Sequence, residues 1–226
     1  MLLHIPAVLS ADDLRQVRAV LDGAAWEDGR RTAGHRAQFV KTNQQLPLDS
    51  AEARDLGALI GDRLMRHPSF LAAALPLRSV PPRFNRYTGE GAYGNHVDNA
   101  IFPVPGSPLS VRTDVSLTVF LSEPEEYEGG ELIIQDTFGQ QVVKLPAGDA
   151  VIYPGSSLHR VTPVTSGARL ASFLWVQSLV PQDHRRRLLY DLDIAIQNLG
   201  ADHPDHDSVD TLTNVYHNLL REWSIT

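Results

Sequence analysis

The sequence predicts an α+β protein whose middle region is mainly β, with helices before and after it. From about residue 81 to residue 180, short runs of β-branched and aromatic residues alternate with turn residues. Helical spacing of apolar residues precedes this region and returns after residue 180. Strands at such close spacing, with no helix between them, indicate antiparallel sheets in a sandwich or barrel.

The N-terminal part is expected to contain a strand followed by three helices. Residues 2–9 are typical of a strand, and Ser10 with Asp13 three positions later forms a helix start. A second helix is predicted from about Ser50 until Pro68 stops it, and a short Ala/Leu-rich helix follows. The chain therefore reaches its β region through a helical lead.

The spacing of apolar residues also predicts the elements of the middle and C-terminal parts. Two amphipathic stripes predict a helical pair over roughly residues 182–223, with the His/Asp-rich segment 200–207 as the loop between the helices. We expect three parts, covering residues 1–80, 81–180 and 181–226. The predicted strands lie at 115–121, 128–136, 140–145, 149–154, 159–164 and 169–180.

Composition restricts the chemistry and the partners. The chain has 20 Lys and Arg against 27 Asp and Glu, a net charge of −7, which argues against nucleic acid and anionic membranes as partners. The basic run 184–187 at a helix start is expected to be a solvated face. With no Cys, any metal must be held by His, Asp or Glu. The first residues lack the pattern of a signal peptide or membrane span, so we expect a cytoplasmic location.

A candidate metal site begins at His96-Val97-Asp98, because side chains two positions apart on a strand share a face. A second pair with this spacing, His203 and Asp205, has Pro at its centre and lies between two helices, so a solvated loop is expected there. The first pair instead follows an extended segment at a glycine-punctuated loop, where polar ligands are typical of a site.

The third candidate ligand is His159, predicted on a strand just after a turn. Two His and one carboxylate form a facial triad, which leaves positions open on an octahedral metal and is typical of non-haem Fe(II) oxygenases. The alternative is that His159 only caps its strand with a satisfied imidazole. Asn99 and the glycine-rich loop are candidates for orienting the ligands.

Arg169 favours the interpretation of His159 as a metal ligand over that of a strand-capping residue. It follows His159 after a turn-rich stretch, so we expect it on the adjacent antiparallel strand, directed toward the same site. A guanidinium among apolar neighbours needs a planar anion, which is either a cosubstrate carboxylate or a structural Glu. Tyr87 is a candidate for donating a hydroxyl to the same cosubstrate. Aromatic residues near the metal motif are candidates for a substrate groove or for the core: Phe84, Tyr87, Tyr93 and Phe102.

With these residues assembled, the sequence resembles the PKHD-type hydroxylases, a bacterial, iron-uptake-associated branch of the prolyl-4-hydroxylase-like Fe(II)/2-oxoglutarate dioxygenases. The resemblance covers nearly the full length. It is carried by Y-x-G-x-G-x-Y-G-x-H-x-D-N at 87–99, E-G-G-E-L at 128–132, G-D-A-V-I-Y-P at 148–154 and H-x-V-x-P-V-x-x-G-x-R at 159–169.

The resemblance implies a double-stranded β-helix, that is, a jelly roll or cupin-like barrel, with iron at its open end. It implies that His96, Asp98 and His159 hold Fe(II), that Arg169 pairs with the distal carboxylate of 2-oxoglutarate, and that Tyr87 hydrogen-bonds it. Collagen-type relatives have Lys where Arg169 stands. O₂ as a second cosubstrate, L-ascorbate (vitamin C) dependence, a link to iron uptake and hydroxylation of proline are further implications of the family.

The implied reaction is hydroxylation of an unactivated C–H bond, with decarboxylation of 2-oxoglutarate to succinate and CO₂, on a small-molecule or peptide substrate. Two alternatives stay open. One is a cupin-like metal enzyme of another class, against which Arg169 argues. The other is a non-enzymatic metal- or ligand-sensing jelly roll whose C-terminal helices form a homodimer.

Two segments are expected to border the site. Residues 30–48 are polar and weakly periodic, and the proline-rich stretch 100–110 leaves the metal motif directly. We expect both to form loops that control substrate entry. Arg36 or Lys41 is expected to contact an anionic part of the substrate.

Overall fold

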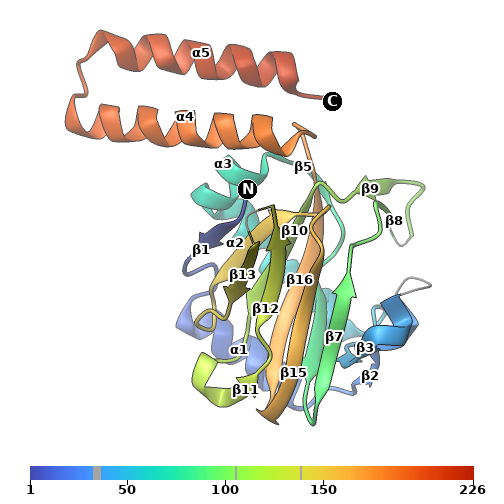
Figure 1. Cartoon of the computed structure of the whole chain (residues 1–226). Helices are drawn as coiled ribbons and strands as arrows, with labels where there is room; N and C mark the ends of the chain where they lie inside the picture. The colour runs from blue at the N-terminus through green and yellow to red at the C-terminus, as the bar shows by residue number, and fades with distance from the viewer. Residues whose placement is uncertain (33–36, 105, 138) are drawn as a thin grey trace.

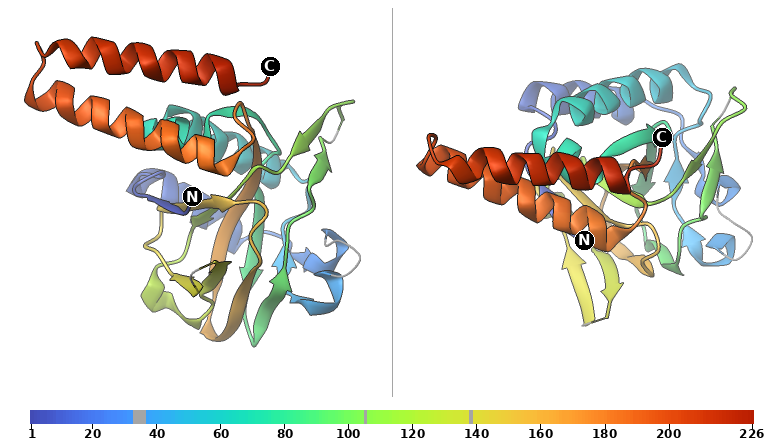
Figure 2. Two further views of the ribbon diagram at one scale, coloured as in Figure 1. Left: turned by 45° about the horizontal axis from the view of Figure 1, so that its top comes forward. Right: turned by 90° about the horizontal axis from the view of Figure 1, so that it is seen from above.

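The computed structural model describes residues 1–226 except 33–36, 105 and 138. Two antiparallel sheets face each other, helices cover the outer side of one of them, and a helical pair extends beyond one end (Figures 1 and 2). The helices are α1 (Ala11–Asp22), α2 (Ala51–Arg66), α3 (Pro68–Ala74), α4 (Asp183–Asp202) and α5 (Asp207–Trp223), and the 3-10 helices are η1 (Gly29–Thr32), η2 (Ala37–Val40) and η3 (Pro124–Glu126).

We call the two sheets the large sheet and the small sheet. The large sheet has the order β1 (Leu3–Ile5), β14 (Ala150–Pro154), β10 (Val115–Phe120), β16 (Arg169–Ser178), β6 (Arg83–Tyr87), β4 (Gln44–Gln45), β2 (Glu27–Asp28), with β5 (Pro76–Ser79) also on β16. The small sheet has the order β13 (Gly139–Val143), β12 (Leu132–Asp136), β15 (His159–Gly167), β7 (Gly91–His96), β3 (Lys41–Thr42), with β11 (Tyr127–Gly129) on β15. A separate hairpin joins β8 (Ile101–Pro103) to β9 (Ser110–Arg112).

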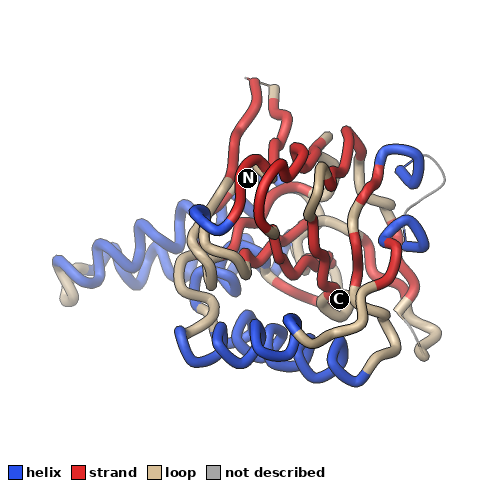
Figure 3. Tube along the Cα trace, turned by 90° about the horizontal axis from the view of Figure 1, so that it is seen from below, coloured by secondary structure: helices blue, strands red, loops and turns tan. Residues whose placement is uncertain are grey.

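The predicted antiparallel sandwich is thus confirmed, and side-chain alternation explains its two cores. On β10, Leu117 and Val119 pack toward α1 and α2, while Ser116 and Thr118 line the space between the sheets. The helices cover the outer face of the large sheet, as the view from below shows (Figure 3). A second apolar cluster that includes Phe120 fills the space between the sheets.

The helical lead follows the sequence prediction closely. The Ser10 hydroxyl accepts a hydrogen bond from the backbone N–H of Asp13, and the Asp13 carboxylate accepts one from the backbone N–H of Ser10, which completes the predicted capping box. Arg63 on α2 also donates to the Asp13 carboxylate, and these hydrogen bonds hold the pKa of Asp13 well below its usual range. The predicted strand 2–9 is shorter than expected, because the chain turns after Ile5.

The described residues of the segment 30–48 differ from the expected loop. They contain η1, η2 and the two-residue strands β3 and β4. Arg36, expected to contact the substrate, lies outside the described residues, whereas Lys41, the other candidate, lines the main cavity. The strand β3 pairs with β7 of the small sheet, whereas β4 pairs with β6 of the large sheet. This segment therefore joins the two sheets along one side. The stretch 100–110 likewise carries β8 and the start of β9, so it borders the molecule as a hairpin rather than as an irregular loop.

The C-terminal helical pair is confirmed, with a turn shorter than predicted because α4 continues to Asp202. The start of α4 packs on α3, the end of α5 joins the same apolar cluster around Leu75, Val180 and Leu189, and the other ends project away from the sheets (Figures 1 and 2). The expectation of a solvated basic run is wrong for Arg186, which is buried and donates to the carbonyls of Val180, Pro181 and Asp114. Among the described residues, none of the helices has both the length and the apolar character of a membrane span.

Candidate metal and 2-oxoglutarate site

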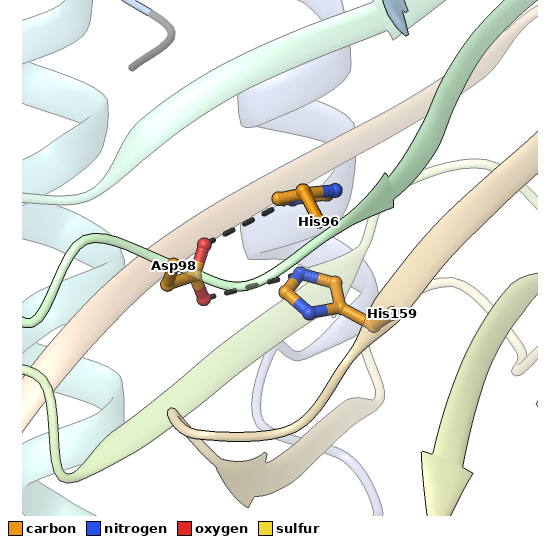
Figure 4. Close-up of side chains that lie close together, drawn as sticks. All are labelled: His96, Asp98 and His159. Atoms are coloured by element: carbon orange, nitrogen blue, oxygen red, sulfur yellow. Dashed lines mark ion pairs between the residues drawn. The ribbon is translucent and has the colours of Figure 1, made fainter. Parts of the chain in front are cut away.

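The three predicted metal ligands come together at one end of the small sheet. His96 is the last residue of β7 and His159 the first of β15, and the two face each other as a cross-strand pair. Asp98 lies just past the end of β7, so it reaches the site from the following segment and not, as the spacing predicted, from the strand itself. Figure 4 shows the three side chains directed toward a common point.

The distances suit a single ion. Asp98 Oδ1 lies 3.9 Å from His96 Nε2, and Asp98 Oδ2 lies 3.9 Å from His159 Nε2. The three ligand atoms lie within 4.8 Å of one another, and among the described residues no other group of His, Asp or Glu meets this spacing. The competing pair His203 and Asp205 is exposed between α4 and α5, as expected for a solvated loop.

Both imidazoles are oriented through their second nitrogen. His96 Nδ1 lies 2.8 Å from the carbonyl of Gly94, and His159 Nδ1 lies 3.0 Å from the carbonyl of Ser157. A carbonyl only accepts, so each Nδ1 carries the proton and each Nε2 presents its lone pair. Burial, followed by the neighbouring His159, lowers the pKa of His96 to about 4, which keeps this ring neutral at physiological pH. The alternative of a strand-capping His159 is therefore not favoured, since its Nε2 is directed at the other two ligands.

Ser116 on β10 fixes the carboxylate. Its hydroxyl donates to Asp98 Oδ2 over 2.7 Å. Asn99, which was predicted to help orient the ligands, instead accepts a hydrogen bond from Thr113 through its main-chain carbonyl. The glycine-rich loop does contribute as predicted, through the carbonyl of Gly94. Sequence reasoning missed Ser116, and its signal was a polar side chain at an inward position of an otherwise apolar strand.

Replacing Ser116 with alanine is expected to weaken metal binding by ~10–100-fold, because the partner that orients a ligating carboxylate is lost. Calorimetric titration of Mn(II) into the apoprotein measures the effect. The matched control is Ser172→Ala: Ser172 is equally buried, and its hydroxyl has no hydrogen-bond partner among the described residues. Equal affinity in the Ser116 variant and the wild type would contradict the orienting role.

One cavity connects the triad to the two predicted cosubstrate residues. It has a volume of about 760 Å³ including its open mouth, and it is lined by all three triad residues together with Tyr87 and Arg169. Arg169 and Tyr87 are a cross-strand pair on β16 and β6, and the Arg169 Cζ lies 5.4 Å from the centre of the Tyr87 ring. Burial raises the pKa of Tyr87, so its hydroxyl stays protonated and able to donate.

The predicted route from His159 to Arg169 is wrong in one respect. Arg169 does not lie on a strand adjacent to β15, because β15 belongs to the small sheet and β16 to the large one. The chain crosses between the sheets at Gly167, which has a φ of 73° and passes within 2.0 Å of the Glu126 carbonyl at the position a Cβ would take. Arg169 therefore faces the metal triad's sheet from the opposite side of the cavity.

The residues present fit an Fe(II) ion and a dicarboxylate keto acid. Arg169 is 1% exposed, and its Nε is buried without a hydrogen-bond partner among the described residues. A buried, unpaired guanidinium is costly unless a ligand completes it. Two imidazoles and one carboxylate form a donor set that suits Fe(II) and leaves positions for further ligands.

Of the aromatic residues near the metal motif, some line the cavity and one belongs to the apolar core. Tyr93 and Phe102 line the cavity with Tyr87, and Tyr93 stacks on His96 with ring centres 3.5 Å apart. Phe84 faces the helices in the outer core. Sequence reasoning missed Arg83 and Trp175, which line the same cavity. The alternation in R-F-N-R-Y was the available signal, since it places residues 83, 85 and 87 on one face.

An antiparallel sandwich that directs two His and one carboxylate at one point defines the class of the non-haem Fe(II) oxygenases. A family model for the 2OG-Fe(II) oxygenase superfamily matches residues 82–177, and one for the PKHD-type hydroxylase C-terminal domain matches residues 183–224. A PKHD-type hydroxylase of Delftia acidovorans is 59% identical over 99% of both chains. PKHD-type hydroxylase PiuC of Pseudomonas aeruginosa is 55% identical, again over 99% of both chains.

The chain therefore belongs to the PKHD-type hydroxylase family, and it is an Fe(II)- and 2-oxoglutarate-dependent dioxygenase. The crystal structure of a Pseudomonas putida prolyl-4-hydroxylase is similar, with a TM-score of 0.54 and 20% identity over 78% of this chain and 92% of that one. HygX from Streptomyces hygroscopicus, solved with nickel, 2-oxoglutarate and hygromycin B, has a TM-score of 0.53 and 17% identity over 79% of this chain and 84% of that one. These likenesses confirm the predicted jelly-roll fold.

Proposed function

We propose that His96, Asp98 and His159 hold the Fe(II), and that Arg169 and Tyr87 bind the distal carboxylate of 2-oxoglutarate. The observation that supports this most is the single cavity, which has the triad at the end of one sheet and the buried Arg169, whose Nε lacks a partner among the described residues, on the other sheet. A dicarboxylate that reached both would bring its keto-acid end to the metal and its other end to the guanidinium.

Each residue then has a role that follows from its position. The two imidazoles offer Nε2 lone pairs, and Ser116 holds the Asp98 carboxylate so that it meets the ion from a fixed direction. Arg169 supplies the planar pair of N–H donors that suits a carboxylate, while Tyr87 adds a hydroxyl beside it. No general acid or base is required of the protein.

The bound metal, together with 2-oxoglutarate and O₂, supplies the oxidising power. One oxygen atom converts a C–H bond into C–OH, the other enters succinate, and the lost carboxyl group leaves as CO₂. The protein orients the reactants and excludes water: Tyr93, Phe102 and Trp175 line the cavity with apolar surface near the triad. Arg169 argues against a metal enzyme of another class, because a buried guanidinium needs an anionic ligand and 2-oxoglutarate supplies one.

Sequential binding tests this assignment. Titration of Mn(II) into the apoprotein is expected to reveal one site per chain, and 2-oxoglutarate is expected to bind tightly only after the metal is present. Calorimetry measures both steps. Tight 2-oxoglutarate binding without metal, or more than one metal site of similar affinity, would contradict the proposed arrangement.

The substrate is a small molecule or a peptide. Solved relatives of similar fold include HygX with hygromycin B and a Trichoplax adhaerens prolyl hydroxylase in complex with a peptide fragment of the hypoxia inducible factor oxygen degradation domain. We propose no nucleic-acid or membrane partner, in keeping with the net charge of −7. The cytoplasmic location, a homodimer, the ascorbate dependence, the link to iron uptake and the division into parts 1–80, 81–180 and 181–226 stay predictions.

A further inference from the structure

Arg83 is a second buried guanidinium in the same cavity, and the roles proposed above do not use it. It lies on β6 two positions before Asn85 and four before Tyr87, so these three side chains share the inward face. Its cross-strand partner is Phe173, just as the partner of Tyr87 is Arg169. The paired strands β6 and β16 thus carry one Arg at each end of the cavity wall.

Arg83 forms no ion pair among the described residues, and the opposite charge that acts on it is that of the triad carboxylate Asp98. Arg83 is only 8% exposed, and it makes no hydrogen bond within the described part of the chain. The contacts that the structure does give are aromatic: its Cζ lies 5.1 Å from the ring centres of both Phe102 and Trp175. Those contacts stabilise a cation less than a paired carboxylate does when the site is desolvated.

The negative charges of the proposed ligands do not neutralise the positive charge of Arg83. Asp98 is the one carboxylate among the described residues that line the cavity. Asp98 and the two carboxylates of 2-oxoglutarate balance the charges of Fe(II) and Arg169. Lys41 adds positive charge in the same cavity: burial, and then the charge of Arg83, lower the pKa of Lys41 to about 8, so most of it stays charged at neutral pH.

The wall beside Arg83 is apolar and aromatic. Phe102 of the β8–β9 hairpin stacks on Trp175 with ring centres 4.0 Å apart, and Phe173 meets Trp175 edge to face at 5.5 Å. All three line the cavity next to the guanidinium. A ligand that matched this wall would present an apolar body to the rings and one planar anion to Arg83.

We propose that Arg83 binds a carboxylate of the primary substrate, whose apolar part packs on Phe102, Phe173 and Trp175. The substrate is then a small amphipathic carboxylic acid, since this part of the cavity offers three rings and one guanidinium as its recognition surface. This inference rests on the proposed function, because it assigns the rest of the cavity to Fe(II) and 2-oxoglutarate. Arg83 is a specificity-determining residue and takes no part in cosubstrate binding.

The test uses the full chain saturated with Mn(II) and 2-oxoglutarate, so that Arg169 is occupied. The probes are 3-phenylpropanoate and its amide, which differ in charge but hardly in shape. The wild type is expected to bind the acid at least about tenfold more tightly than the amide, a difference of ~1.4 kcal/mol. Arg83→Gln is expected to reduce this preference to less than about twofold, and Arg83→Lys to retain part of it because the charge remains. Quenching of Trp fluorescence measures the affinities.

The matched control is Arg86→Gln on the same strand. The Arg86 side chain faces away from the cavity, donates to Gln44 and lies over the Trp26 ring. This variant is expected to keep the full preference for the acid. The affinity for 2-oxoglutarate is expected to be unchanged within about twofold in every variant, which also shows that each variant is folded.

The outcomes separate this inference from the proposed function. Suppose that 2-oxoglutarate binds, but that the wild type binds acid and amide equally or that Arg83→Gln keeps the preference for the acid. Either result would refute the role of Arg83 and leave the proposed function intact. A loss of 2-oxoglutarate binding in Arg83→Gln would move Arg83 to the cosubstrate site. Tighter binding of the peptide acetyl-Gly-Gly-Phe than of 3-phenylpropanoate would overturn the assignment to a small acid. Failure of the wild type to bind 2-oxoglutarate would refute the proposed function instead.

Discussion

Replacing His96 with alanine is expected to reduce Fe(II)-dependent succinate formation from 2-oxoglutarate to the level of a sample without iron. The variant removes one of three converging ligand atoms and leaves only His159 and Asp98 for the ion. A bidentate remnant holds a divalent metal weakly, and it no longer fixes the side on which the keto acid binds. Succinate is measured directly, and metal content is measured in parallel after dialysis against a fixed Fe(II) concentration without oxygen.

The control is His203→Ala, which removes a histidine from the second His-x-Asp pair in the chain. His203 is exposed at the end of α4. Its loss is expected to leave turnover and metal content unchanged. Equal losses in both variants, or in neither, would remove the basis for assigning the iron to His96.

Replacing Arg169 with leucine is expected to raise the concentration of 2-oxoglutarate needed for half-maximal turnover by roughly 30-fold or more. Truncating one partner of a buried charge pair costs ~2–5 kcal/mol, because the other charge loses its counter-ion. Arg169→Lys is expected to do less damage, since it keeps the charge and loses the two-pronged geometry. Steady-state succinate formation over a range of 2-oxoglutarate concentrations measures both variants.

Pyruvate gives an independent check of the same residue. It has the keto-acid end but no distal carboxylate, so it leaves the buried Arg169 guanidinium without a counter-ion from the cosubstrate in the wild type. Pyruvate is expected to be a poor substitute for the wild type, and the gap between the two keto acids should narrow in Arg169→Leu. Arg86→Leu, whose side chain faces the other side of the large sheet, is the control. An unchanged 2-oxoglutarate requirement in Arg169→Leu would show that the distal carboxylate binds elsewhere.

Features that depend on neighbours in the chain could be predicted from the sequence. The capping box needs only Ser10 and Asp13, and the helix stop needs only Pro68. The triad could be predicted because His96 and Asp98 are two residues apart and His159 follows a recognisable turn. Spacing and local context suffice for such features, since a short segment fixes where its own side chains lie.

Features that depend on which strands meet could not be predicted in the same way. Arg169 was expected on a strand beside β15, yet the chain passes to the other sheet at Gly167, the last residue of β15. Ser116 donates to a carboxylate on a segment from the opposite sheet, and no local pattern specifies that contact. Arg83 shares a face with Tyr87 by alternation, but only the sheet order shows that this face is the inner one.

The strands β3 and β4 were missed for a related reason. Each has two residues, which is too short for alternation to be visible. They form because β6 and β7 already present open backbone groups at the sides of the two sheets. Sheet pairing that is induced by a neighbour leaves little trace in the paired segment itself.

The triad lies at the end of one sheet and Arg169 lies on the other, so the distance between the two sheets sets the distance between the triad and the guanidinium. Facing sheets lie ~10 Å apart, and the distance is set by the side chains packed between them. Phe120, Leu132 and Val161 belong to that inner packing. Larger or smaller side chains at these positions would lengthen or shorten the span that a dicarboxylate must bridge. In the proposed arrangement the inner core is therefore expected to favour a five-carbon keto acid over its four- and six-carbon homologues, and Leu132 and Val161 also line the cavity.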